Sequence, residues 1–126
     1  FNPDIPKADK VICDVPCSGL GVIRRKPEIK YKPMKLLETL PDTQRKIINN
    51  AAEYVKPGGT LIYSTCTVSK AENDDIVDEF LAEHCDFVPV VIPLGVKGLE
   101  ESYKRTMLPC DINGDGFFTA TLRKVK

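Results

Sequence analysis

Apolar runs alternate with helical patterns through most of this chain of 126 residues, and that alternation restricts its fold most strongly. Four runs have the length and composition of strands: residues 10–15, 60–64, 87–92 and 116–123. Helices are expected between the first three, over residues 43–55 and from about residue 69 to residue 83. Strand–helix–strand order favours a parallel sheet, and the pairing expected of the last two strands adds an antiparallel edge. We therefore predict an α/β domain with a mostly parallel sheet and an antiparallel last strand.

Three local signals set the expected ends of the helices. Pro41 should separate the first helix from a preceding turn over residues 36–40, and Pro-Gly-Gly at residues 57–59 should stop it. Ser69 and Glu72 have the spacing of a capping box, which places the start of the second helix near Ser69.

The composition is that of a globular domain, with 42% hydrophobic and 29% charged residues. No apolar run approaches the roughly 20 residues that span a bilayer, and the first ten residues, FNPDIPKADK, do not form a signal peptide. We expect a cytoplasmic protein without a membrane segment. Because the chain opens on a polar stretch without an initiator Met, we also interpret it as a piece of a longer protein.

The five cysteines do not suggest a disulfide framework or a metal site. Their number is odd, their spacings are irregular, and they include no Cys-x-x-Cys pair. The single histidine, His84, adjoins Cys85 without zinc-like spacing. Reduced thiols and no bound metal are the simpler interpretation.

Charge is unevenly distributed, although 18 basic and 18 acidic residues balance. Residues 24–35 hold six basic side chains against Glu28 alone, so this segment could contact phosphate or could be a solvated loop. Residues 71–86 hold seven acidic side chains and no Lys or Arg, and we interpret them as the solvated face of a helix.

Residues capable of chemistry follow two of the expected strands. Asp14 and Cys17 come after the first, and Cys66 comes after the second. Ligands of open α/β sheets bind at the carboxyl ends of strands, so these residues should converge. A lone cysteine is usually a small buried residue, but a thiolate with a lowered pKa is a soft nucleophile. The basic side chains of residues 24–26 could supply the electropositive setting.

A soft thiolate suits conjugate addition to a pyrimidine. Sulfur added at carbon 6 of cytosine makes carbon 5 nucleophilic enough to take a methyl group from a sulfonium. A base then removes the carbon-5 proton, and the sulfur leaves. Asp14 could bind the N3 and exocyclic amine edge of the base, or it could be a turn residue at the end of a strand.

Three segments resemble motifs of the Sun/Fmu (RsmB-like) bacterial ribosomal RNA cytosine-C5 methyltransferases: DVPCSGLGVIRRKPEIKY, GGTLIYSTCTVSKAEN and GDGFFTATLRK. The resemblance implies an enzyme that methylates carbon 5 of a cytosine in ribosomal RNA, with 16S RNA the best guess, from S-adenosylmethionine. It also implies a Rossmann-like fold, of which residues 1–126 would form the carboxy-terminal half of the catalytic domain. The cofactor-binding amino-terminal half would be absent, and the full-length protein would carry a further RNA-binding domain.

The resemblance also implies roles for single residues. Cys66 would attack the base, Cys17 would assist release of the methylated RNA, and Asp14 would lie between cofactor and base. Asp14 and Pro16 are the expected cofactor contacts. Four basic residues are the expected RNA contacts: Arg24, Arg25, Lys26 and Lys30. DNA cytosine methyltransferases use the Pro-Cys cysteine as nucleophile instead, but the Thr-Cys block argues against that exchange of roles.

The chain departs from the family where the cofactor should bind. The glycine-rich first strand and the acidic second strand are missing, and Arg24 stands where Gly19-Leu20-Gly21 would need a third glycine. We therefore expect weak or absent cofactor binding by this chain alone. Alternatives are a catalytically silent RNA-binding piece of the same fold and a C5 methyltransferase acting on transfer RNA. A cysteine hydrolase lacks a convincing catalytic histidine.

One segment imitates a calcium loop. Asp111, Asn113 and Asp115 have the spacing that begins an EF-hand, but Leu122 stands where the bidentate Glu is required. A tight turn before the last strand is the better interpretation.

Overall fold

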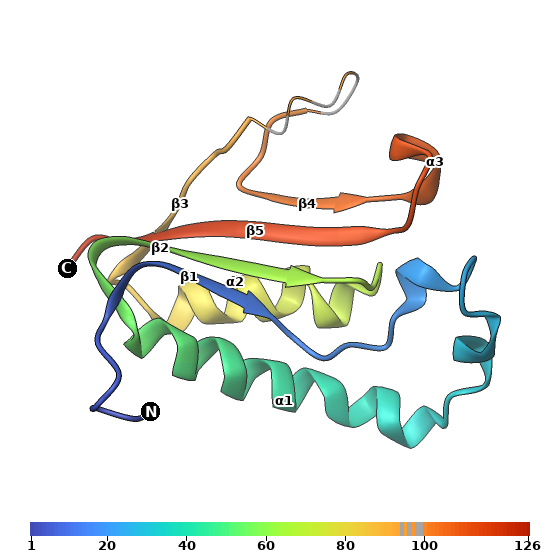
Figure 1. The fold of residues 1–126 in the computed structure, drawn as a ribbon, viewed down its shortest axis with the longest axis horizontal. Coiled ribbons are helices and arrows are strands. Elements are labelled where there is room, and N and C mark those ends of the chain that lie inside the picture. Colours follow the sequence, from blue (N-terminus) through green and yellow to red (C-terminus); the bar gives the residue numbers. More distant parts are fainter. Residues whose placement is uncertain (94, 96, 98–99) are drawn as a thin grey trace.

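The computed structural model describes every residue except 94, 96, 98 and 99. It has a five-stranded sheet with two helices, α1 (Met34–Glu53) and α2 (Asp74–Glu83), against one face (Figure 1). The strands are β1 (Ala8–Asp14), β2 (Val55–Thr65), β3 (Phe87–Pro89), β4 (Lys104–Met107) and β5 (Phe117–Lys124). Short helices η1 (Leu20–Val22), η2 (Pro27–Tyr31), η3 (Lys70–Glu72) and α3 (Pro109–Ile112) lie in the connections.

The sheet is mixed, with strand order β1-β2-β5-β3 and with β4 also paired to β5. The α/β class and the antiparallel last strand are confirmed. The expected excess of parallel pairing is wrong for the described residues, where β1–β2 is the one parallel pair. The reason is that β5 lies inside the sheet, antiparallel to β2, and both β3 and β4 pair antiparallel with its other edge.

The sheet face under the helices forms the core. Side chains alternate along the strands, so Leu61 and Tyr63 of β2 are fully buried, whereas Ile12 of β1, on the opposite face, is 71% exposed. Large buried side chains from the other elements complete this core: Ile48, Ile76, Phe80, Phe118 and Leu122.

Helix α1 continues through Pro41 instead of beginning after it. A proline removes one backbone hydrogen bond of a helix. The apolar stripe explains why the helix persists, since Leu37 and Pro41 are partly buried on the same face as the buried Gln44 and Ile48. The expected boundary at Pro41 was therefore wrong, because packing outweighs the local preference of one residue.

The Pro-Gly-Gly motif follows the end of α1, as predicted, but it also lies within β2. Ala8 pairs with Val55 and Lys10 pairs with Thr60, so residues 56–59 bulge out of the register. Gly58 has a φ of 80°, which a glycine adopts readily.

The capping box was also a wrong prediction. Ser69 precedes η3 without a side-chain capping bond, and α2 begins only at Asp74. The side chain of Glu72 is buried and bonds to other segments, so it cannot reach back to the backbone of Ser69.

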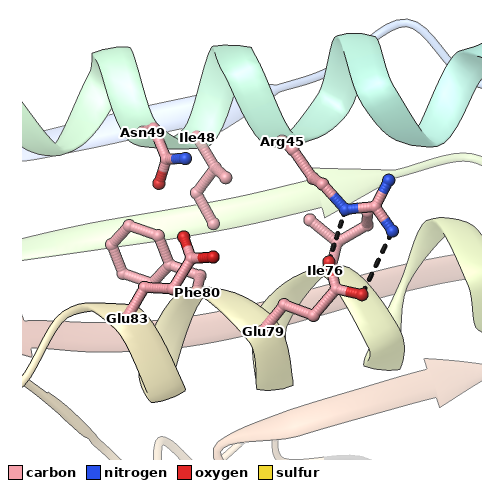
Figure 2. A pocket seen from close by; sticks show the side chains of 7 residues that line it. All are labelled: Arg45, Ile48, Asn49, Ile76, Glu79, Phe80 and Glu83. Atoms are coloured by element: carbon pink, nitrogen blue, oxygen red, sulfur yellow. Dashed lines mark hydrogen bonds and ion pairs between the residues drawn. The ribbon is translucent and has the colours of Figure 1, made fainter.

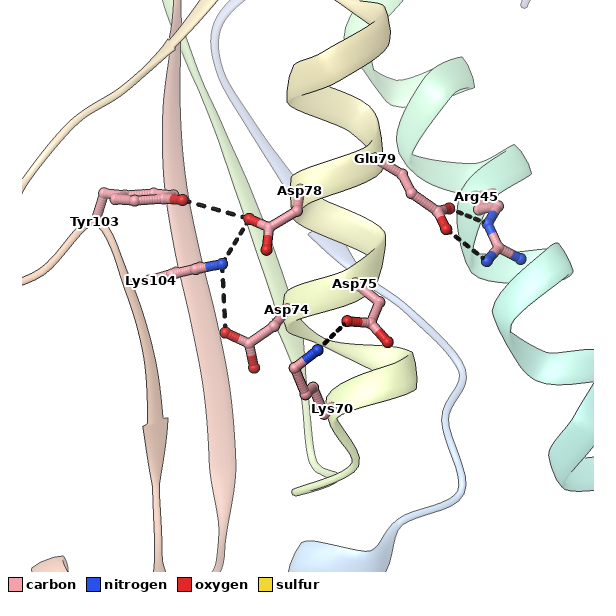
Figure 3. A network of polar contacts seen from close by, with 8 residues as sticks. All are labelled: Arg45, Lys70, Asp74, Asp75, Asp78, Glu79, Tyr103 and Lys104. Atoms are coloured by element: carbon pink, nitrogen blue, oxygen red, sulfur yellow. Dashed lines mark hydrogen bonds and ion pairs between the residues drawn. The ribbon is translucent and has the colours of Figure 1, made fainter.

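The acidic segment is more than a solvated face. Lys104 Nζ of β4 lies 2.5 Å from Asp78 Oδ1 and 3.4 Å from Asp74 Oδ1, both on α2 (Figure 3). Arg45 of α1 pairs with Glu79 of α2 beside a hollow between the two helices (Figure 2). The acidic side chains thus attach α2 to its neighbours.

Among the described residues, no helix is both long and apolar enough to cross a membrane.

Candidate functional site

The thiols of Cys17 and Cys66 meet at one edge of the sheet. Cys66 directly follows β2, and Cys17 lies in the loop after β1. Because β1 and β2 are parallel neighbours in register, with Asp14 opposite Ser64, their carboxyl ends lie together. The two Sγ atoms are 3.2 Å apart and share a hydrogen bond, and both residues are half-buried. The structure thus brings together the two cysteines that the sequence singled out.

A buried carboxylate lies behind these two loops. Glu72 is 4% exposed, and its oxygens accept four hydrogen bonds. Oε1 accepts from Ser18 N at 2.8 Å and from Gln44 Nε2 at 3.1 Å. Oε2 accepts from Ser18 Oγ at 2.6 Å and from Thr67 Oγ1 at 3.1 Å. Ser18 and Thr67 each directly follow one of the two cysteines, so the carboxylate joins both cysteine loops.

A second group of polar contacts fixes the turn after β2. Asn73 Nδ2 donates to Thr67 O at 2.9 Å, and Asn73 Oδ1 accepts from Thr65 Oγ1 at 2.7 Å. Tyr63 Oη donates to Glu72 O at 2.6 Å, and burial raises the pKa of this phenol. These side chains are all buried, so the turn that carries Cys66 is supported from the core.

Two glycines allow the loops to cross closely. Gly21 N donates to Cys66 O at 3.0 Å, and Gly116 N donates to Gly21 O at 2.7 Å. A Cβ on Gly21 would lie 2.1 Å from Gly116 O and 2.7 Å from Cys66 O. Gly21 is therefore needed for packing of the protein's own backbone, and that backbone fills the space where a ligand cradle could have been.

Asp14 and Pro16 lie exposed at the same edge. The carboxylate of Asp14 accepts a hydrogen bond from Ser64 Oγ at 3.0 Å, a contact between the ends of β1 and β2. The carbonyl of Pro16 accepts from Gln44 Nε2 at 3.0 Å. Asp14 is therefore oriented by the neighbouring strand while its carboxylate remains open to a ligand.

The expected RNA contacts lie on the surface beyond Gly21. Lys26 and Lys30 are exposed. The side chains of Arg24 and Arg25 are 59% and 60% exposed, and both face Asp115. Arg25 Nε lies 2.6 Å from Asp115 Oδ2, while Arg24 Nη2 is 4.0 Å from Oδ1. Asp115 thus holds the arginine pair beside the turn before β5.

These arginines do not lower the pKa of Cys17, contrary to expectation. Burial, followed by the hydrogen bond between Cys17 and Cys66, raises the pKa of the Cys17 thiol to about 11. The physical reason is that Arg24 and Arg25 are directed to Asp115, while Cys17 lies half-buried against another thiol. Cys17 is therefore held in its protonated form at neutral pH.

Residues outside the edge have other partners. His84 Nε2 bonds to Asn49 Oδ1 at 2.9 Å, between the two helices. Asp111 Oδ2 accepts from Leu108 N at 2.9 Å, whereas Asp115 pairs with Arg25, so these two carboxylates of the calcium-like segment have separate tasks. The chain turns before β5 at Asn113, where φ is 50°.

Sequence reasoning missed the polar support of the site. It assigned Glu72 to a helix cap and gave no role to Gln44. A glutamine on the apolar face of a helix was the available signal, because a buried amide requires hydrogen-bond partners. Gln44 is fully buried and joins α1 to Pro16 and Glu72.

The chain is similar to known proteins over nearly its whole length. A family model described as 16S rRNA methyltransferase RsmB/F matches residues 3–123. "Probable ribosomal RNA small subunit methyltransferase B" of Bacillus subtilis (strain 168) is 41% identical over 122 residues, covering 92% of this chain and 27% of that protein. "Ribosomal RNA small subunit methyltransferase F" of Escherichia coli O9:H4 (strain HS) is 35% identical over 133 residues, covering 100% of this chain and 28% of that protein.

A solved structure agrees with these relatives. The crystal structure of NSun6 from Pyrococcus horikoshii with SFG is 34% identical to this chain, with a TM-score of 0.79. The similarity covers 98% of this chain and 32% of that one. The chain therefore spans less than a third of the length of each of these proteins.

Proposed function

The chain belongs to the 16S rRNA methyltransferase RsmB/F family, and from that premise we propose that it forms the cytosine-binding part of an RNA cytosine-C5 methyltransferase. Its fold is that of a partial Rossmann-like domain. The observation that carries the proposal is the 3.2 Å separation of Cys17 Sγ and Cys66 Sγ at the carboxyl ends of neighbouring parallel strands. Two thiols so placed can act on one base.

Cys66 is the proposed nucleophile. Its sulfur bonds to carbon 6 of cytosine, and carbon 5 then takes the methyl group. A base then removes the carbon-5 proton, and the electron pair of that C–H bond restores the double bond between carbons 5 and 6 as the carbon–sulfur bond breaks and Cys66 leaves as a thiolate. The place of Cys66 in the Thr-Cys block, which resembles the nucleophile motif of the family, supports this assignment.

Cys17 is proposed to assist release. Its sulfur is in hydrogen-bond contact with Cys66 Sγ, the atom that must leave as a thiolate. A thiol that donates to this sulfur stabilises the developing negative charge. Asp14 is proposed to bind the N3 and amine edge of the base, since its carboxylate lies exposed at the same edge.

S-adenosylmethionine would supply the methyl group, and the described residues fit only part of a site for it. Asp14 and Pro16 are exposed where they could contact it. The Gly19-Leu20-Gly21 segment does not fit, because backbone atoms of Gly116 and Cys66 fill the space over Gly21. A neighbour of this fold was solved with SFG, an analogue of this cofactor. We propose that residues 1–126 are part of a larger catalytic domain, whose other residues complete the cofactor site.

The proposed substrate is small-subunit ribosomal RNA, as the names of the relatives suggest. Lys26, Lys30 and the Arg24–Arg25 pair are exposed cations that could neutralise phosphates. Such a substrate would place the protein in the cytoplasm. A catalytically silent piece fits less well, because the close pair of thiols would then have no task.

The test is a covalent protein–RNA adduct, formed by the intact protein with S-adenosylmethionine and ribosomal RNA. Cys17→Ala should accumulate the adduct on a denaturing gel, since release is blocked, and Cys66→Ala should abolish it. The exposed Cys85 provides a control, and Cys85→Ala should behave as wild type. Accumulation in Cys66→Ala instead would make Cys17 the nucleophile, and no adduct in any variant would contradict covalent catalysis.

A further inference from the structure

We propose that Glu72 is a positioning residue that holds the thiols of Cys17 and Cys66 at their working distance. The geometric part concerns only the two cysteine loops, whereas the catalytic consequence rests on the proposed function. Glu72 itself reaches the thiols through the residues that follow them, Ser18 and Thr67.

The setting of Glu72 is unusual for an acidic side chain. It is 4% exposed, and among the described residues no Lys or Arg forms an ion pair with it. All four of its polar partners are donors, which suits a carboxylate with acceptor oxygens only. Burying such a group without a cation is unfavourable unless donors replace the lost water, and here four donors from three other residues do so. Their convergence on one side chain fixes the relative positions of the segments that carry them.

The carboxylate binds the Cys17 loop by two bonds at once. The backbone N–H and the hydroxyl of Ser18 donate to different oxygens of Glu72, which fixes both the position and the orientation of that loop. Lys32 Nζ donates to Ser18 O at 2.8 Å and holds the same residue from the other side. These bonds restrict the backbone position of Cys17, which directly precedes Ser18.

The same carboxylate binds the Cys66 loop and α1. Thr67 Oγ1 shares Oε2 with Ser18 Oγ, and these two hydroxyls lie 2.9 Å apart. Gln44 of α1 donates to Oε1 and also to Pro16 O. One carboxylate thus joins the ends of β1 and β2 and the helix between them. Other bonds also cross between the two loops, among them Ser18 Oγ to Thr67 Oγ1 and Gly21 N to Cys66 O, but Glu72 binds both loops and α1 at once.

The rate of disulfide formation depends on how closely the two thiols are held together, and it can be measured without a substrate. Diamide oxidises two thiols to a disulfide, and its N=N group takes up the two electrons and two protons. The rate in the intact protein can be followed by mass spectrometry of the peptide pair that holds Cys17 and Cys66. Glu72→Ala should slow the reaction about tenfold or more, because small displacements of reacting atoms have large effects. Glu83→Ala is the matched control, since Glu83 is an exposed residue of α2, and it should react at the wild-type rate.

A conservative variant separates positioning from simple stability. Glu72→Gln keeps the shape, and its amide can donate to the hydroxyls of Ser18 and Thr67 while its oxygen accepts from Ser18 N. We expect it to restore most of the disulfide rate. A folded Glu72→Ala protein with wild-type kinetics would overturn the proposal. If that variant does not fold, Ser18→Ala carries the test, with slower oxidation supporting the proposal and an unchanged rate rejecting it.

The catalytic consequence has its own measurement. With the intact protein and RNA, Glu72→Ala should lower kcat and leave KM for RNA unchanged, because the exposed RNA contacts are untouched. Equal kcat in a folded Glu72→Ala protein would reject the catalytic part. If wild type itself forms no methylated product or adduct, the proposed function fails, while the disulfide rates still decide whether Glu72 positions the thiols.

Discussion

Two glutamates seven positions apart show how differently this protein uses the same side chain. Glu72 is buried behind the cysteine loops and bonded to four donors without a cation. Glu79 lies on the exposed surface between α1 and α2 and pairs with Arg45 (Figure 3). The arginine lowers the pKa of the Glu79 carboxyl, but water screens this pair.

The difference distinguishes two regions. At the carboxyl edge of β1 and β2 the contacts fix the positions of the loops, whereas on the outer surface of α1 and α2 they attach one helix to the other. At the carboxyl edge of β1 and β2, buried polar groups and the close backbone contacts at Gly21 and Gly116 fix the loops. Small changes there should therefore lower the free energy of unfolding strongly. Across the outer surface of the helices, exposed ion pairs should be individually dispensable. Matched substitutions in the two regions test this contrast.

The largest effect is expected at the glycine crossing. Gly21→Ala should lower the free energy of unfolding by about 3 kcal/mol or more, because the new Cβ meets backbone that cannot move aside. Gly58→Ala, at the opposite end of β2, should lower it by only about 1 kcal/mol, from the positive φ alone. Urea unfolding of both variants measures the contrast, and equal losses would refute it.

A smaller effect is expected at adjacent residues of α1 that face the two regions. Gln44→Leu should lower the free energy of unfolding by about 2 kcal/mol, because Glu72 and Pro16 each lose a buried donor. The loss is limited because Gln44 Oε1 has no partner among the described residues. Arg45→Leu breaks the exposed pair with Glu79 and should leave the unfolding curve close to wild type. A greater loss in Arg45→Leu would reverse the comparison.

These contrasts also show how much of the fold the sequence could predict. Apolar runs located β1, β2, β3 and β5, although β3 ends at Pro89 and not at residue 92, and the helical spacing of apolar residues located both helices. These patterns did not predict β4 or the internal place of β5. Residues 104–107 of β4 are all partly buried and lack a clear alternation, and strand order depends on pairing across long connections.

At the site, strand ends predicted the cysteine pair because parallel neighbours end at one edge of a sheet. The support from Glu72 was not predictable by the same means, since Ser69 and Glu72 fit a local capping pattern equally well. The role of Glu72 is determined by long-range hydrogen bonds from Ser18 and Gln44, and residue spacing along the chain does not predict such bonds.

Thiol titration tests the comparison at the cysteines themselves. Cys17 should react with iodoacetamide along a curve with a midpoint near pH 11, because burial raises the pKa of its thiol to about 11. Since the folded protein holds this proton more tightly, the associated stability is present below pH 9 and is lost as pH rises toward 11. Cys13 contributes in the same range, since burial raises its pKa to about 11. Cys17→Ala should therefore reduce, without removing, the loss of stability over this range, and a midpoint below pH 9 would contradict the burial argument.

The smallest effects are expected for single surface cations, where the two regions should differ in RNA binding but not in stability. Lys26→Ala, beside the cysteine edge, should weaken ribosomal RNA binding a few-fold. It should also reduce the slope of the logarithm of the binding constant against the logarithm of the salt concentration by about one, as expected for the loss of one phosphate contact. Lys46→Ala, on exposed α1, should change neither. Filter binding at several salt concentrations measures both variants of the intact protein. Equal losses of RNA affinity would mean that binding depends only on the overall charge of the protein. A loss confined to Lys26→Ala would indicate that RNA binds over the basic segment that begins at Arg24.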